Sequence, residues 1–231
     1  MRRPFGPPWA RLGSNYKLPA APGAALSTLL SRLRRTLGSP AIEGRALVSL
    51  SLPPESWIDL EAAEEAVAGA AKALAAEAPA DAHATAQAAY EIASQPLLPA
   101  IDLPWVERRQ RYLEDVCHRA LEILARSGLS LSGPSLDSGE RAARLLIEAD
   151  PFRETGYALL MEIYASRGRV AEALQVFELL RVLLREELGT GPAPNIMALH
   201  QQLLAGADPE LERVRPAPGN EPAPRVGPPA R

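Results

Sequence analysis

The sequence predicts an all-α protein of one or two domains, and two observations carry that prediction. Apolar residues recur at steps of three and four along residues 156–188, which is the spacing of one face of a helix. Alanine and leucine supply most of the 47% hydrophobic content, and aromatic residues make up 5% of the chain. This composition favours helices packed through small side chains over a sheet of β-branched residues.

The clearest pair of helices lies on either side of Gly168, and we expect an antiparallel hairpin there. The apolar stripe before the glycine is Leu159, Leu160, Ile163 and Tyr164, and the stripe after it is Ala173, Phe177, Leu180, Leu184 and Leu188. With Gly168 at the turn, Tyr164, Ala173 and Phe177 match an aromatic, a small and an aromatic position of a 34-residue tetratricopeptide unit. Such a hairpin offers a groove for another protein element, not a reaction centre.

The other helices are expected in order along the chain. An Ala-rich helix at 59–78 pairs with a helix at 80–94, and a long helix at 105–127 has an inner stripe of Leu113, Val116, Ala120 and Leu124. A loop at 129–138, rich in Gly, Ser and Pro, precedes a helix at 139–149 that Asp150-Pro151 ends. A helix at 195–205 closes the bundle. We expect the Pro-rich segments 1–23 and 206–231 to be disordered.

The charge divides the chain into two parts. Residues 1–50 hold eight Lys or Arg against one acid, Glu43, a net charge of +7, whereas residues 51–231 hold seventeen against twenty-seven, a net charge of −10. A basic block ahead of an acidic helical body suggests a segment that faces nucleic acid joined to one that faces protein. The alternative is a solvated, disordered basic terminus.

Residues 24–38 predict a helix with two distinct faces. On a helical wheel the leucines at 26, 29, 30, 33 and 37 fall on one side, and Thr28, Ser31, Arg32 and Arg35 fall on the other. A recognition helix needs this division, because leucines seat it on a domain while Arg, Ser and Thr reach phosphates or base edges. Residues 42–52, with alternating apolar side chains, predict a short β-hairpin after it.

Several segments of the helical part resemble one known family. They are Asp150-Pro-Phe-Arg-Glu154, Leu160-Met161, Gly168-Arg169, Ala171-Glu-Ala-Leu174, Leu180-Arg181 and Leu184-Arg-Glu-Glu-Leu-Gly189, with Pro96-Leu-Leu-Pro99 and Trp105-Val-Glu-Arg-Arg109 upstream. In this order they are similar to the bacterial transcriptional activator domain of SARP or AfsR-like regulators. The resemblance covers residues 59–204 and implies a tetratricopeptide-like helical bundle at 57–205.

The helix and hairpin at 24–56 resemble the last third of the winged-helix domain that precedes the activator domain in this family. The resemblance implies DNA contacts from Thr28, Ser31, Arg32, Arg34 and Arg35 on the helix and from Arg45 on the wing. About sixty residues of such a domain would come before this helix, and residues 1–23 cannot supply them. The chain is therefore either a fragment of a longer regulator or a short form with a degenerate DNA-binding half, and we expect weak binding.

No pattern in the sequence predicts catalysis, a cofactor or a metal site. His83, His118 and His200 fall on different helices without partners at metal-ligand spacing, and no phosphate-binding glycine loop or nucleophile elbow occurs. The single cysteine, Cys117, fits a reducing cytoplasm, and no apolar run of about 18 residues predicts a membrane span.

Two functions remain open from the sequence. One is a transcriptional regulator whose partners are promoter DNA and, through the bundle, RNA polymerase or a second protomer. The alternative is a helical protein–protein interaction module that does not bind DNA.

Overall fold

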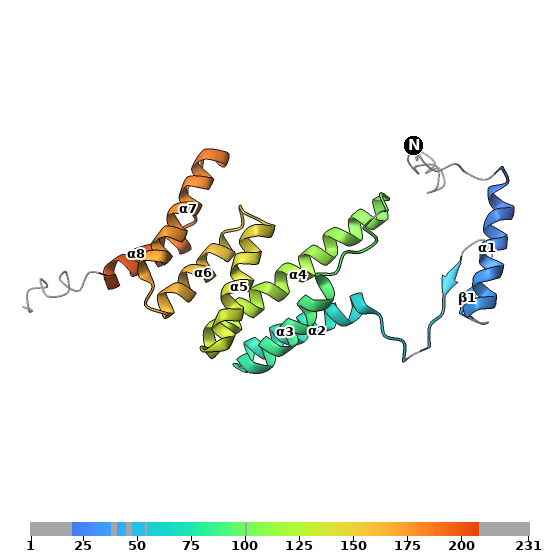
Figure 1. Cartoon of the computed structure of the whole chain (residues 1–231), viewed down its shortest axis with the longest axis horizontal. Coiled ribbons are helices and arrows are strands. Elements are labelled where there is room, and N and C mark those ends of the chain that lie inside the picture. Colours follow the sequence, from blue (N-terminus) through green and yellow to red (C-terminus); the bar gives the residue numbers. More distant parts are fainter. Residues whose placement is uncertain (1–19, 38–40, 45–47, 54, 100, 208–231) are drawn as a thin grey trace, which may run out of the picture. The chain divides into compact units, whose positions relative to one another are not determined.

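The computed structural model describes residues 20–37, 41–44, 48–53, 55–99 and 101–207 (Figure 1). Its elements are α1 (Pro22–Leu37), β1 (Ile42–Glu43), β2 (Ser49–Leu50), α2 (Asp59–Ala75), α3 (Pro79–Ala93), α4 (Pro104–Leu131), α5 (Pro134–Ala149), α6 (Glu154–Ser166), α7 (Val170–Leu188) and α8 (Pro194–Ala207). The all-α prediction is confirmed. The expected disordered segments lie mostly outside the described residues.

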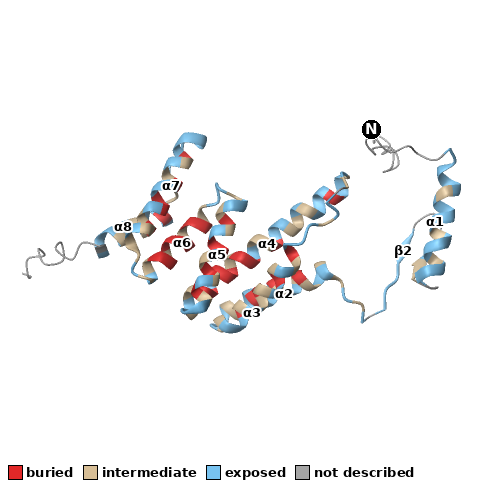
Figure 2. Ribbon diagram, in the orientation of Figure 1, coloured by how far each residue is buried: buried red, intermediate tan, exposed pale blue. Residues whose placement is uncertain are grey.

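The chain divides into two compact units, Met1–Ala62 with Pro96–Tyr112, and Ala63–Gln95 with Leu113–Arg231. In the first unit, α1 is followed by the predicted hairpin, which is shorter than expected. β1 and β2 pair antiparallel, with Ile42 opposite Leu50 and Glu43 opposite Ser49. None of the residues of α1 is buried, and Figure 2 shows this helix without the red of buried positions.

The second unit is a series of helices whose first pair packs through small side chains. Ala63, Val67 and Ala70 of α2 are buried, and so are Ala82, Ala86, Ala89 and Ala93 of α3. The side chains of α3 and α4 also bond to each other, since His83 Nδ1 lies 3.0 Å from the Ser127 hydroxyl. Alanine is the best helix former and allows close approach, so the Ala-rich sequence at 59–94 gives both the helices and their contact.

The loop predicted at 129–138 is wrong. α4 continues to Leu131 and α5 begins at Pro134, so the connection is Ser132 and Gly133, both with positive φ. Pro134 occupies the first turn of α5, where its missing N–H and fixed φ suit a helix start. Gly128 and Gly139, which flank the segment predicted as a loop, lie where α4 and α5 touch: the Cα of Gly128 lies 3.4 Å from where a Cβ on Gly139 would stand.

The predicted hairpin around Gly168 is confirmed. α6 packs on α5 and α7, and α8 packs on α7 and α6. Gly168 has a φ of +71°, a left-handed conformation that glycine adopts at no steric cost. Tyr164, Ala173 and Phe177 are all buried, as the tetratricopeptide spacing predicts. Phe177 stacks on His200 of α8 with ring centroids 3.9 Å apart, so the last helix joins the same core.

Candidate nucleic-acid interface and helical groove

The polar face of α1 is solvent-exposed along its length. Thr28, Ser31, Arg32 and Arg35 are all exposed, as DNA-contacting side chains must be. The Thr28 hydroxyl donates to the Ala24 carbonyl at 2.9 Å, which leaves its oxygen able to accept a further hydrogen bond. These four side chains share one face of the helix, so a single surface could reach them together. The structure holds no DNA, and their role stays a prediction.

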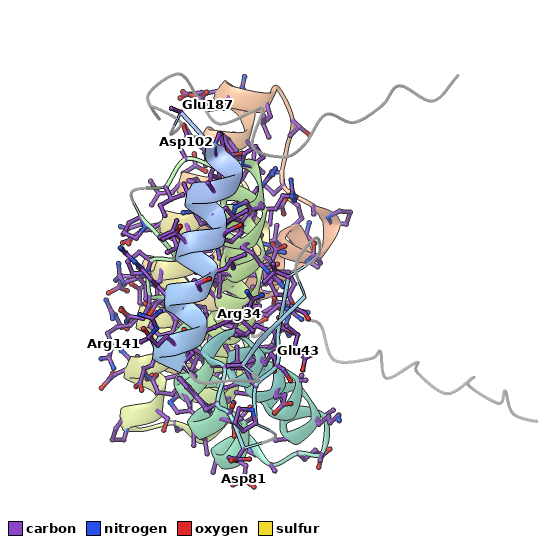
Figure 3. The ribbon with its side chains drawn as sticks, turned by 90° about the vertical axis from the view of Figure 1, so that its right-hand side faces the viewer. Arg34, Glu43, Asp81, Asp102, Arg141 and Glu187 are labelled. Carbon is purple, nitrogen blue, oxygen red and sulfur yellow. The ribbon has the colours of Figure 1, made fainter. Side chains whose placement is uncertain are left out.

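Arg34 is placed differently from the other predicted contacts. Its Nε donates to the Ile42 carbonyl at 3.1 Å, and its guanidinium also bonds the Gly44 carbonyl. Figure 3 labels Arg34 on α1 and Glu43 on the hairpin that it reaches. Arg34 therefore fixes the hairpin against the helix, a role that the sequence pattern did not indicate. Arg45, the predicted wing residue, lies outside the described residues.

Four of the five leucines on the apolar face of α1 are exposed, and Leu30 is partly buried. The exposed fractions of Leu26, Leu29, Leu33 and Leu37 are 57%, 56%, 46% and 55%. A row of leucines with this exposure is unusual, because isolated exposed leucines are common in soluble proteins but a continuous apolar stripe marks an interaction surface.

A second apolar surface lies in the helical body. α5, α6 and α7 form a groove of about 600 Å³ whose lining residues are Arg144, Ile147, Glu148, Pro151, Tyr157, Leu160, Tyr164, Glu172, Gln175, Val176, Leu179 and Leu183. α6 lies between the other two helices and packs on both. Eight of the twelve lining residues are aliphatic, aromatic or proline, so the groove suits an apolar protein element.

Charged side chains gather around Tyr164, which lines the groove. Glu140 of α5 receives Arg167 at 2.7 Å and Arg144 at 3.0 Å, and the Tyr164 hydroxyl donates to it at 3.3 Å. Arg169 lies over the ring of Tyr164, 4.5 Å from its centroid. Because these groups satisfy one another, they are better explained as a clamp between α5, α6 and the α6–α7 turn than as a reaction centre.

The segment from Asp150 to Glu154 has a structural role that the sequence only partly indicated. Asp150 accepts a bond from the Phe152 N–H at 3.3 Å, as expected of an Asp at a helix boundary. The Glu154 carboxylate accepts the Ala193 N–H at 2.8 and 3.1 Å, which ties the start of α6 to the residue before α8. No sequence signal pairs these two residues, since they are 39 positions apart.

His83 and Cys117 are both partly buried in the helical body. Burial lowers the pKa of His83 below its ordinary value, although a bond to the Leu124 backbone acts in the opposite direction. Burial, with Glu114 nearby, raises the pKa of the Cys117 thiol, which disfavours a reactive thiolate. Within the described ranges no group of three or more His, Cys, Asp and Glu side chains could hold a metal ion. No described helix is both long and apolar enough to cross a membrane.

The fold and these surfaces define a tetratricopeptide-like helical module that presents a groove, preceded by a basic helix with a hairpin. Residues 58–204 match the bacterial transcriptional activator domain, and the chain belongs to that family. The resemblance seen in the sequence is thus confirmed.

The relatives are regulatory proteins much longer than this chain. The chain is 32% identical over 201 residues to the regulatory protein AfsR of Streptomyces griseus, covering 87% of this chain and 20% of that protein. It is 30% identical over 203 residues to AfsR of Streptomyces coelicolor, covering 84% of this chain and 19% of that protein. The chain thus spans about a fifth of the length of these relatives.

The same fold occurs in a solved structure of Mycobacterium tuberculosis EmbR in complex with a low-affinity phosphopeptide. The TM-score is 0.69 at 24% sequence identity, and the likeness covers 84% of this chain and 52% of that one.

Proposed function

We propose that this chain regulates transcription by contacting promoter DNA through α1 and the hairpin, and RNA polymerase or a second protomer through the helical body. The family supports a regulatory role, since its domain is a transcriptional activator domain. The DNA part rests on one observation: Ser31, Arg32 and Arg35 form an exposed polar face opposite the leucines of α1. In this proposal the protein acts in the cytoplasm and is not an enzyme.

The proposed contact uses helix and wing together. Arg32 and Arg35 pair with phosphates or guanine edges, and Thr28 and Ser31 bond phosphate oxygens. Arg34 holds the hairpin at the helix, so that Arg45 on the wing can approach the backbone of the duplex.

The test is an anisotropy titration of the full chain with a labelled duplex of mixed sequence at several salt concentrations. We expect weak binding that falls steeply with salt. The Arg32→Ala/Arg35→Ala variant should lower the slope of log K against log salt by up to about 2, since each phosphate contact contributes roughly 0.9. Arg141→Ala/Arg185→Ala removes two exposed charges from the helical body and should leave the slope unchanged.

A second candidate function is a helical interaction module without DNA contact. It is favoured by the exposed leucine face of α1 and by the apolar groove over α6. If the full chain fails to bind DNA at about 50 mM salt, where phosphate contacts are strong, this second function replaces the first.

A further inference from the structure

The first two turns of α4 carry aromatic and basic side chains on one face. Trp105, Arg108, Arg109 and Tyr112 follow one another at helical spacing and line a hollow of about 360 Å³. Trp105 is 50% exposed, and both arginines are exposed. Arg109 lies over the ring of Tyr112, 5.6 Å from its centroid. These four residues are named the aromatic–arginine row below.

The row continues a stripe of α4 that is buried further along the helix. Val116, Ile123 and Ser127 lie on the same side of α4 as Trp105 by helical spacing, and all three are buried. Ahead of Val116 this stripe is open in the part of the chain that the structure describes. A purely apolar element laid over the open part would bury the guanidinium of Arg109, and an unpaired buried charge is costly. The row therefore suits an anionic occupant.

The arginines of the row have no carboxylate partner among the described residues. Other arginines of the helical body do pair with carboxylates, namely Arg126, Arg144, Arg167, Arg169 and Arg181. Arg108 and Arg109 thus keep their hydrogen-bond donors available for a ligand, and the contact of Arg109 with Tyr112 limits the rotamer freedom that binding would remove.

The charge around the row is positive in an otherwise acidic body. Residues 105–112 hold three arginines against Glu107, a net charge of +2, whereas residues 51–231 as a whole carry −10. Glu107 and Glu114 fall on the far side of the helix from Trp105 by helical spacing, and Asp115 lies one turn beyond Tyr112. An anion at the row therefore meets a local excess of positive charge.

The row combines two chemistries that a nucleotide uses together. Guanidinium groups bind phosphate through charge-assisted hydrogen bonds, and an indole face stacks on any flat base. An acidic peptide would use the arginines and leave the indole face without a matching group. The bases of a duplex are stacked inside it, so the nucleotide would come from a single strand or from a free nucleotide.

We infer that the aromatic–arginine row binds a nucleotide unit, with its base stacked on Trp105 and its phosphate held by Arg108 and Arg109. The inference goes beyond the duplex contact proposed for α1 and does not require it, because the row lies on α4 and shares no residue with α1.

Tryptophan fluorescence of the full chain tests the stacking. With Trp9→Phe and Trp57→Phe, Trp105 is the sole tryptophan, and Arg32→Ala/Arg35→Ala removes the duplex contacts proposed for α1. We expect a single-stranded DNA of mixed sequence, about ten nucleotides long, to quench the emission of Trp105. An abasic strand of the same length is the matched control and should leave the emission unchanged. Equal quenching by both strands, or quenching by neither, would overturn the inference.

Anisotropy titration of the same labelled strand tests the individual side chains. Trp105→Leu keeps apolar bulk but removes the ring, and should weaken binding about tenfold. Arg108→Ala/Arg109→Ala should lower the slope of log K against log salt by up to about 1.4, since each phosphate contact with a single strand contributes roughly 0.7. Arg141→Ala/Arg185→Ala removes two other exposed charges and should change neither quantity. Circular dichroism verifies folding, and folded variants that all bind like the wild type would contradict the assignment.

AMP in the fluorescence assay distinguishes the two sources of the nucleotide. Tighter binding of the strand than of AMP identifies a single strand as the ligand, and equally tight binding of AMP identifies a free nucleotide. These titrations use the Arg32→Ala/Arg35→Ala background, so failure of α1 to bind duplex DNA changes none of their results. The inference and the proposed function are therefore tested separately.

Discussion

Individual polar residues of the helical body form hydrogen bonds and ion pairs that connect its helices and turns. Glu154 bonds the Ala193 N–H, and Glu140 gathers Arg144, Arg167 and the Tyr164 hydroxyl. The sequence predicted the apolar positions because their spacing is local. Glu140 and Arg144 are four positions apart on α5, but the sequence could not predict the bonds from Glu154 to Ala193 and from Glu140 to Arg167 and Tyr164, since these depend on how the chain folds back.

Phe177 is the residue on which the tetratricopeptide prediction depends most directly. Its side chain is 4% exposed and stacks on His200, so Phe177→Ala should lower the free energy of unfolding by roughly 3 to 5 kcal/mol through the cavity it leaves. Phe152→Ala is the control, because Phe152 is 45% exposed and should cost less than about 1 kcal/mol. Urea denaturation measures the free energy of unfolding of both variants. Equal losses in the two variants would contradict the assignment of Phe177 to the buried face of α7.

His83 should make the stability of the body depend on pH. Its pKa in the folded state is lowered, mainly by burial, so the unfolded state binds the proton more tightly. The contribution of neutral His83 to folding stability is fully present above about pH 6.5, the ordinary pKa of histidine. It is lost as the pH falls from there toward the lowered pKa of the folded state. His83→Gln should therefore flatten the decline in melting temperature on acidification. Parallel curves for the wild type and His83→Gln would argue against this coupling.

At the scale of elements, the spacing of apolar residues predicted each described helix, whereas the connection between α4 and α5 was wrongly predicted as a long loop. Apolar periodicity is a property of the helix itself, so the hairpin of α6 and α7 lies on either side of Gly168 as predicted. The prediction of a loop at 129–138 was wrong because Gly, Ser and Pro residues there suggested irregular backbone along the whole segment. Only Ser132 and Gly133 turn the chain, and the residues on either side belong to α4 and α5, which touch at Gly128 and Gly139.

Gly128 and Gly69 should respond to alanine in opposite directions. A Cβ on Gly128 would stand 2.4 Å from the Ser135 carbonyl oxygen, so Gly128→Ala should force α4 and α5 apart and cost about 1 to 3 kcal/mol. A Cβ on Gly69 would meet Thr85 at 3.8 Å, an ordinary contact, so Gly69→Ala should stabilise α2 by up to about 1 kcal/mol. Thermal melts of both variants provide the check. Stabilisation by Gly128→Ala would mean that the close contact is not present.

At the scale of the whole molecule, the sequence predicted the division between a basic leading segment and an acidic body. The family match at 58–204 agrees with the predicted activator domain. The DNA-facing set came from the family resemblance, and the four members that helical spacing placed on one face, Thr28, Ser31, Arg32 and Arg35, do lie exposed on α1. The role of Arg34 in holding the hairpin could not be predicted, because it depends on carbonyls that point toward the helix only after the hairpin has turned.

This division predicts that the body folds without the leading segment. α1 buries no residue, and the described residues of β1 and β2 are at most partly covered, so removing them takes little apolar area from the core. A fragment of residues 58–207 should give a helical circular dichroism spectrum and one cooperative melt within a few degrees of that of the full chain. The core of this fragment is held by stacking of α2 to α8, each helix covering its neighbour's apolar face. A loss of cooperativity in the fragment would show that the leading segment contributes to the core, and a strand-rich spectrum would contradict the fold itself.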